Sequence, residues 1–193
     1  MLRRVYNWTM ALAAGRHAEK ALAGVSFAES SFFPIPPDLL LIPMVLAERI
    51  KAWRYAAICT IASVIGGVFG YLIGAFLFEQ IARPILDLYG FGAKFDEFAG
   101  WYNDWGAWIV FAAGLTPFPY KVITIASGAT GLDFIVFSIA SIAARGLRFF
   151  IVAGLLYWVG PPIRAFIEKR LGLVFTVFTV LLIGGFVALR YLI

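Results

Sequence analysis

The chain has 193 residues, of which 62% are hydrophobic and only 14% are charged, and its mean hydropathy is +0.90. A soluble domain has roughly 45–50% apolar and about 25% charged residues, so this composition excludes an ordinary soluble protein and predicts a single polytopic membrane domain. The formal net charge of +5 comes from basic residues scattered between apolar segments, which argues against a nucleic-acid partner.

Residues 1–20 form a polar N-terminal stretch that we interpret as an uncleaved interfacial helix. Val5, Trp8 and Leu12 fall at helical spacing, as expected on the apolar face of a helix that lies in a membrane surface. A signal peptide is the alternative, because two arginines precede the apolar residues, but polar residues interrupt that run.

Five apolar segments follow, near residues 21–47, 55–78, 105–130, 134–158 and 171–193. The second, fourth and fifth have the roughly 20 residues that a spanning helix needs. The first and third are each interrupted by prolines: Pro34, Pro36 and Pro37 in one, Pro117 and Pro119 in the other. Proline removes a backbone donor and stops a helix, and a broken helix at membrane depth is tolerated only inside protein or beside a water-filled cavity.

The two proline breaks align with each other. When Pro34 is laid on Pro117, Asp38 falls on Lys121, so the two turns carry opposite charges. The helices behind them also match, since Tyr-Leu-Ile-Gly ending at residue 74 parallels Tyr-Trp-Val-Gly ending at residue 160. Paired breaks in the two halves of a chain are typical of inverted-repeat transporters and point to the binding site.

Loop charges predict how the broken segments sit in the membrane. The N-terminus and the loops at 48–54 and 160–170 are rich in Lys and Arg, whereas the 79–104 connection has five acids against Arg83 and Lys94. If both broken segments are re-entrant, every basic loop is cytoplasmic and the acidic connection is outside, as the positive-inside rule prefers.

The expected fold is therefore an all-α polytopic membrane protein built as an inverted repeat. Residues 21–78 form the first repeat and 105–160 the second, each a re-entrant proline-broken hairpin followed by a spanning helix, and 171–193 is a C-terminal spanning helix that ends outside. The 79–104 connection has apolar residues at three- and four-residue steps, which predicts an amphipathic helix on the outer leaflet. A surface loop is the alternative.

Four glycines, Gly66, Gly67, Gly70 and Gly74, form a small-residue stripe along the 55–78 helix. Such a stripe allows another helix to approach closely. We interpret it as a helix-packing surface rather than as part of a transport path.

Five charged residues lie in or beside apolar segments: Glu29, Asp38, Lys121, Arg145 and Arg148. A charge at the centre of a spanning helix costs about 2.5–3.5 kcal/mol and normally marks a substrate or ion path. Two acids in the first half and three bases in the second predict a polar cluster between the repeats. The bases suit a phosphate group and the acids a proton path. Buried ion pairs that only stabilise the fold are the alternative.

The chain has none of the signatures of an enzyme, such as a phosphate-binding glycine loop or a nucleophile elbow. With only His17 and Cys59 of their types, it offers no His/Cys metal site and no internal disulfide. An intramembrane protease would need two acids, but Glu29 and Asp38 are separated by a proline turn and neither lies in a predicted spanning helix. The sequence predicts a protein that is not an enzyme and needs no cofactor.

At Phe27–Asp38 (FAESSFFPIPPD) and Gly114–Lys121 (GLTPFPYK), the chain resembles the DedA family, also described as the VTT or SNARE-associated Golgi family, and in particular its short YqaA-like bacterial branch. The resemblance covers roughly residues 20–160. It implies a bacterial inner-membrane protein with two opposed re-entrant hairpins, linked to flipping of undecaprenyl phosphate or scrambling of phospholipids and to the proton motive force.

The resemblance also implies roles for individual residues. The family's essential acids fall on Glu29 and Asp38, and its essential arginines fall on the second hairpin and the helix after it, where Lys121 replaces the hairpin arginine. Lysine binds phosphate as a point charge and is not equivalent to arginine, so the resemblance does not carry over a particular substrate.

Three functions remain open from the sequence. The first is a flippase or scramblase that binds a lipid phosphate through Lys121, Arg145 and Arg148, with Glu29 and Asp38 in proton coupling. The second is a proton-coupled carrier for a small solute. The third is a membrane scaffold acting through the glycine stripe and the amphipathic connection. The expected partners are membrane lipids, protons and a second copy of the chain.

Overall fold

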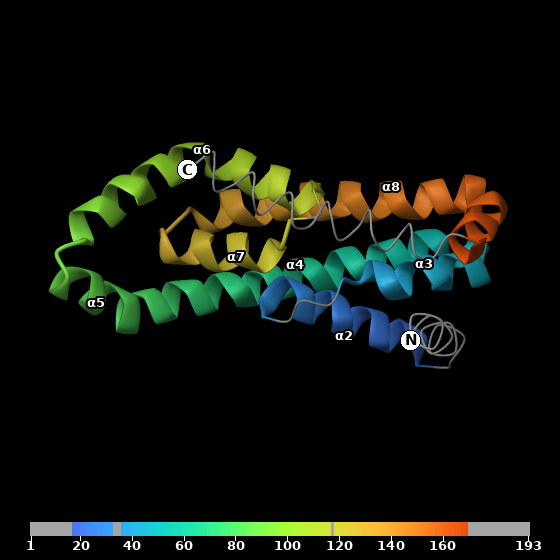
Figure 1. The fold of residues 1–193 in the computed structure, drawn as a ribbon, viewed down its shortest axis with the longest axis horizontal. Helices are drawn as coiled ribbons and strands as arrows, with labels where there is room; N and C mark the ends of the chain where they lie inside the picture. Colours follow the sequence, from blue (N-terminus) through green and yellow to red (C-terminus); the bar gives the residue numbers. More distant parts are fainter. Residues whose placement is uncertain (1–16, 33–35, 117, 170–193) are drawn as a thin grey trace.

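A computed structural model describes residues 17–32, 36–116 and 118–169, and these residues form helices and short connections (Figure 1). The main helices are α2 (Ala18–Ser31), α3 (Asp38–Ala47), α4 (Ala52–Leu77), α5 (Arg83–Leu88), α6 (Gly92–Leu115), α7 (Tyr120–Ala129) and α8 (Phe134–Lys169). No strand occurs in these described ranges. The expected all-α fold is confirmed.

Two of the helical stretches are long and apolar enough to cross a membrane. Within the described residues these are Arg49–Leu88, with 40 residues, and Phe134–Gly160, with 27. They contain the second and fourth apolar segments of the sequence, as expected. Residues 1–16 of the interfacial helix predicted over 1–20, and the predicted span 171–193, lie outside the described residues and stay predictions.

The first broken segment folds as a helical hairpin with α2 and α3 as its arms. Pro37 directly precedes α3, and its carbonyl accepts the amide protons of Leu40 and Leu41, each at 2.9 Å. Helix α2 runs toward the middle of the molecule and α3 returns to the end from which α2 came (Figure 1). Pro36 lies in the connection, whereas Pro34 lies outside the described residues.

The second broken segment folds as a hairpin from the C-terminal part of α6 and α7. Thr116 has an extended backbone, with ψ at 165°, and Pro119 precedes α7 with φ at −62°; Pro117 lies outside the described residues. This hairpin enters from the other end of the molecule, so the two hairpin tips approach each other near its middle (Figure 1). That both hairpins are re-entrant in a membrane stays a prediction.

The connection over 79–104 differs from the single helix expected there. Helix α4 continues through a π-helical turn, Phe78–Ala82, into α5, and α6 then begins at Gly92. The chain turns between them because Gly90 has a φ of +74°, and the amide of Phe91 donates to the carbonyl of Leu86 at 2.8 Å. This is the glycine C-terminal cap that ends a helix, and the sequence interpretation overlooked it.

The glycine stripe packs both hairpins against α4. A Cβ at Gly66 would meet the backbone of Phe27 in α2, and one at Gly74 would meet the backbone of Ile125 in α7. Gly128 of α7 faces the backbone of Tyr71 in the same way. The packing interpretation is confirmed, and the stripe is covered by the chain itself rather than exposed to a partner.

Two apolar cores lie under the two hairpins. One contains Leu22, Leu41, Met44, Cys59 and Phe149, and the other contains Tyr102, Val110, Tyr120, Leu132 and Phe137. Along both α4 and α8, buried polar residues fall between the positions that belong to the two cores, at Ser63 in α4 and at Ser141 and Arg145 in α8. A polar layer therefore separates the two cores.

Candidate functional site

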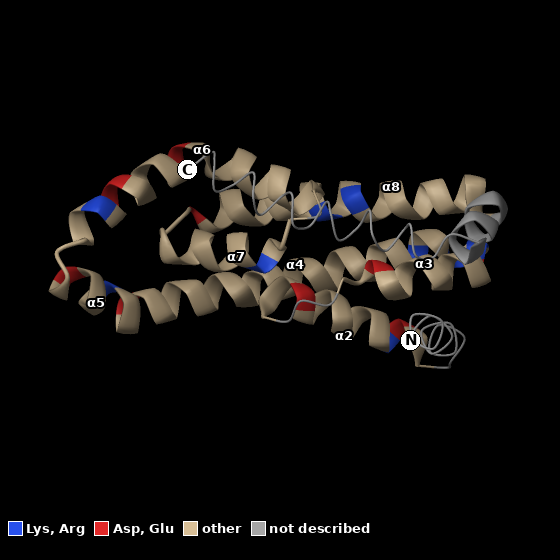
Figure 2. Cartoon of the chain, viewed as in Figure 1, with Lys and Arg blue, Asp and Glu red and all other residues tan. Residues whose placement is uncertain are grey.

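Four of the five charged residues form two ion pairs across the halves of the chain. Arg145 Nη2 lies 2.5 Å from Glu29 Oε2, and Arg148 Nη2 lies 2.6 Å from Asp38 Oδ2. Both acids come from the first hairpin and both arginines from α8. Figure 2 shows charged residues near mid-length of the bundle, apart from those at its two ends. The predicted polar cluster between the two halves is confirmed for these residues.

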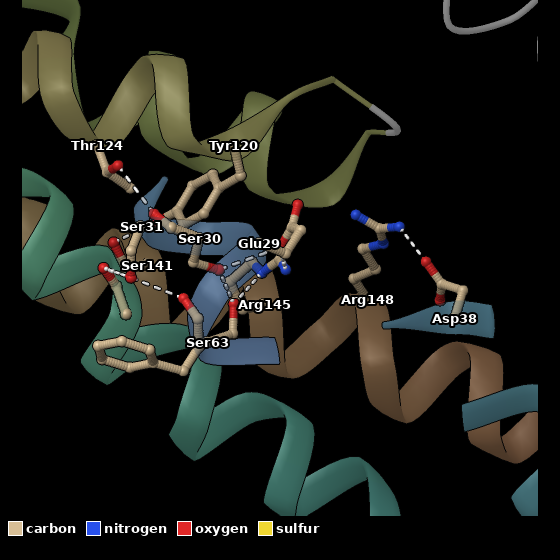
Figure 3. Close-up of polar contacts among 12 residues, drawn as sticks. Glu29, Ser30, Ser31, Asp38, Ser63, Tyr120, Thr124, Ser141, Arg145 and Arg148 are labelled. Carbon is tan, nitrogen blue, oxygen red and sulfur yellow. Dashed lines mark hydrogen bonds and ion pairs between the residues drawn. The ribbon is translucent and has the colours of Figure 1, made fainter. Parts of the chain in front are cut away.

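The pair between Glu29 and Arg145 belongs to a closed ring of hydrogen bonds (Figure 3). Arg145 Nε donates to Ser63 Oγ at 2.6 Å, the hydroxyls of Ser63 and Ser30 are 2.6 Å apart, and Ser30 Oγ donates to Glu29 Oε2 at 3.1 Å. The Arg145 side chain is fully buried and that of Glu29 is 12% exposed. Because a buried charge must be paired and hydrogen-bonded, the ring holds Arg145 in one position.

Two aromatic rings further fix Arg145. Its guanidinium carbon lies 4.8 Å from the ring centres of both Tyr120 and Phe149, close enough for cation–π attraction. The Tyr120 hydroxyl donates to Ser141 Oγ at 2.5 Å, which sets the orientation of that ring. Arg145 Nη1 is buried and has no hydrogen-bond partner in the described part of the chain.

The pair between Asp38 and Arg148 is more open. Their side chains are 17% and 14% exposed, and the single bond between Nη2 and Oδ2 joins them. The guanidinium carbon of Arg148 lies 5.8 Å from the centre of the Phe149 ring. Asp38 is the first residue of α3, where the helix N-terminus stabilises a carboxylate.

Lys121 is the one member of the predicted cluster of five charges that forms no ion pair within the described residues. It is partly exposed and makes no salt bridge with any residue that the structure describes. The expectation of a partner in the other half is thus confirmed for Asp38 and wrong for Lys121. The reason is the register of α7, in which the neighbouring Tyr120 is buried against Arg145 and Lys121 faces a different direction.

Direct hydrogen bonds also join the first hairpin to its surroundings. Thr124 Oγ1 in α7 donates to the carbonyl of Ser30 at 3.1 Å, and Ser31 Oγ donates to the carbonyl of Gly66 at 3.0 Å. Ser30, Ser31 and Thr124 flank the two proline turns in the sequence. They connect the two hairpins through the polar layer.

Sequence reasoning missed two members of the site, Ser63 and Ser141. Both carried a usable signal. Ser63 stands three residues before Gly66 and therefore on the same helix face as the glycine stripe, and Ser141 stands one helical turn before Arg145. A polar residue on a helix-packing face next to a buried charge is a reasonable candidate for its hydrogen-bond partner.

A hollow of about 510 Å³ between α6 and α8 lies on a different surface from the charged pairs. It is lined by apolar residues that include Trp108, Phe111, Ile139 and Ala143. At 100° per residue, Ile139 and Ala143 project from roughly the opposite side of α8 from Arg145 and Arg148. We therefore place the candidate site at the ion pairs and Lys121, where the charges are.

The basic residues and the helix N-termini at this site would attract negative charge. Arg148 is accessible and uses one nitrogen in its bond to Asp38, Lys121 has no acid partner among the described residues, and both α3 and α7 begin beside it with N-termini that favour negative charge. No group of three or more His, Cys, Asp or Glu in the described ranges is arranged to hold a metal ion.

Comparison with known proteins gives a family match and two relatives. The VTT domain matches residues 33–158. An uncharacterized protein of Haemophilus influenzae is 38% identical over 170 residues, which cover 88% of each chain, and an uncharacterized protein of Histophilus somni is 33% identical over 167 residues, which cover 86% of this chain and 87% of the other. No solved structure matches the chain significantly.

Proposed function

Because this chain belongs to the family of membrane-associated proteins with a VTT domain, we propose that it moves a phosphate-bearing lipid between the two leaflets of a bacterial inner membrane. The lipid is a phospholipid or a polyprenyl phosphate. Its headgroup passes through the polar layer where the two hairpin tips approach each other, while its hydrocarbon chains stay in the bilayer.

The observation that carries this proposal is the pairing of acids from one half with arginines from the other at mid-length of an apolar bundle. Each charge is costly in hydrocarbon, and a fold that needed only packing would gain as much from apolar residues of similar size. The charges lie where two broken helices begin again, which is the place of substrate sites in transporters built from inverted repeats.

The three basic residues would have different roles in binding a phosphate. Arg148 can present two parallel N–H groups to phosphate oxygens, and Lys121 adds a mobile point charge from the start of α7. Arg145 is too deeply enclosed to reach a headgroup. We assign it to positioning: it holds the first hairpin against α4 and α8.

The test is transport by the purified full-length protein in liposomes that carry fluorescent headgroup-labelled phospholipids or polyprenyl phosphate. We expect labelled lipid in the inner leaflet to become accessible to an added quencher faster than in protein-free liposomes. Arg148→Gln should abolish the gain. Arg83→Gln is the matched control, since Arg83 forms an exposed pair with Asp96 at the α5–α6 end and should transport normally. Absence of transport for every lipid class would refute the proposal.

Proton-coupled transport of a small solute is the second candidate. It is favoured by the acids themselves: Glu29 receives both of its hydrogen bonds at Oε2, so Oε1 has no hydrogen-bond partner within the described residues. The variant Glu29→Gln tests whether Glu29 carries the proton in such coupled transport. Activity that survives but no longer depends on pH would assign Glu29 as the proton carrier, and an unchanged pH profile would remove it from that role.

A further inference from the structure

We infer that Asp38 is a tethered anion that competes with the lipid phosphate for Arg148, so that substrate enters by displacing this carboxylate. The inference rests on the proposed function and concerns the regulation of the same site. It assigns to Asp38 the role of a gate on the positively charged passage, in addition to any part in proton coupling.

The two ion pairs differ in a way that allows only one of them to exchange partners. Arg145 is fully buried and is held by Glu29, by Ser63 and by two aromatic rings. Arg148 has Asp38 as its ion-pair partner, and both side chains retain some exposure. An incoming anion can therefore reach Arg148 without dismantling the ring around Arg145.

A carboxylate and a phosphate can bind the guanidinium group of Arg148 in the same geometry. Each offers oxygens that accept parallel N–H bonds from a guanidinium group. In the structure Asp38 uses one oxygen and Arg148 uses one nitrogen, so a phosphate that binds two guanidinium nitrogens would make more bonds than the carboxylate it replaces.

The displaced carboxylate keeps a favourable environment. Asp38 is the first residue of α3, a helix of 10 residues, and the partial positive charge of the helix N-terminus stabilises it after it leaves Arg148. Because Asp38 belongs to the first hairpin and Arg148 to α8, the exchange also removes an ion pair that joins these two elements. Phosphate binding would thus loosen the first hairpin at the point where the headgroup has to pass.

Binding measurements test the competition directly. The probe is dihexanoyl phosphatidic acid, titrated calorimetrically into the purified full-length protein in detergent. If Asp38 holds Arg148 about nine-tenths of the time, Asp38→Asn should bind the probe about tenfold more tightly than the wild type. Adding Arg148→Gln to that variant should abolish the gain. Glu29→Gln removes the same charge from the buried pair and should not tighten binding.

A second measurement leaves the ion pair intact. Leu39 follows Asp38 and its side chain is 53% exposed, so a bimane attached to Leu39→Cys, in a protein with Cys59→Ala, reports on the start of α3. Phosphatidic acid should change its emission and diacylglycerol, which lacks the phosphate, should not. Folded Asp38→Asn protein that binds no more tightly than wild type, or bimane emission that ignores the phosphate, would overturn the inference. Either result could accompany normal lipid transport by the wild type, whereas failure of the proposed function is a wild type that transports no lipid.

Discussion

Arg145 and Ser63 stand 82 positions apart in the chain, yet Arg145 Nε donates a hydrogen bond of 2.6 Å to Ser63 Oγ. This bond joins α8 to α4, and the ring continues through Ser30 and Glu29 to α2. Three helices from both halves of the chain are thus held together around one buried positive charge. The predictions below follow from this layer and from the packing beside it.

Ser63→Ala should destabilise the protein without removing any charge. The variant leaves Arg145 Nε buried without a partner, in addition to Nη1, and an unsatisfied buried donor costs about 1–3 kcal/mol. Thermal unfolding in detergent measures the change. Ser138→Ala is the control, because the Ser138 hydroxyl bonds only to the carbonyl of Phe134 within its own helix; an equal loss in both variants would contradict the role of the ring.

Gly66→Ala should separate α2 from α4. The added Cβ would run into the carbonyl of Phe27, and overpacking of this kind typically costs about 1–3 kcal/mol. Gly100→Ala is the matched control, since Gly100 lies in α6 with nothing within 4 Å of its added Cβ. That substitution should stabilise the helix by about 0.5–1 kcal/mol. Opposite signs of the two changes in melting temperature are expected.

Lysine substitutions should distinguish the structural role of Arg145 from the binding role of Arg148. Arg145→Lys cannot bond Ser63 and Glu29 as the guanidinium does and should lower the free energy of unfolding by about 1–3 kcal/mol, with loss of transport. Arg148→Lys should lose less stability, because its pair is partly exposed, but should bind lipid phosphate more weakly. Melting curves and binding titrations on both variants distinguish the roles; equal destabilisation would argue that both pairs are purely structural.

Lys121→Met should abolish transport while the protein still accumulates and unfolds normally. Lys121 is partly exposed and has no ion pair in the described part of the chain, so its removal should change stability by no more than about 0.5 kcal/mol. The liposome assay and a melting curve give the two readouts. Normal transport by this variant would take Lys121 out of the substrate site.

Cysteine labelling tests the topology. Lys51 directly precedes α4, and Asp96 lies in the second turn of α6; the starts of these helices are at opposite ends of the bundle (Figure 1). After replacement of Cys59, single cysteines at 51 and 96 should react with an impermeant maleimide from opposite sides of the membrane. Reaction of both from the same side would show that α4 does not cross the membrane.

Local chemistry in the sequence determined much of this protein. The prolines predicted where the broken segments turn, the apolar lengths predicted the two described spans, and the glycine spacing predicted a packing face. Each of these properties depends on backbone sterics or on hydrophobicity within one element, so it can be read without knowledge of the neighbours. Gly90 carried the same kind of local signal for the turn between α5 and α6, although the predicted single helix ignored it.

Partner choice was decided only by the tertiary structure. The alignment of the turns placed Asp38 and Lys121 at equivalent positions but did not name their partners. The structure pairs Asp38 with Arg148, 110 positions away, and gives Lys121 no acid partner among the described residues. Ser63 is a hydrogen-bond partner of Arg145 because α4 packs against α8. Which charges meet depends on how far each helix is rotated and slid when its apolar face is buried, and that is settled by the packing of all the helices together.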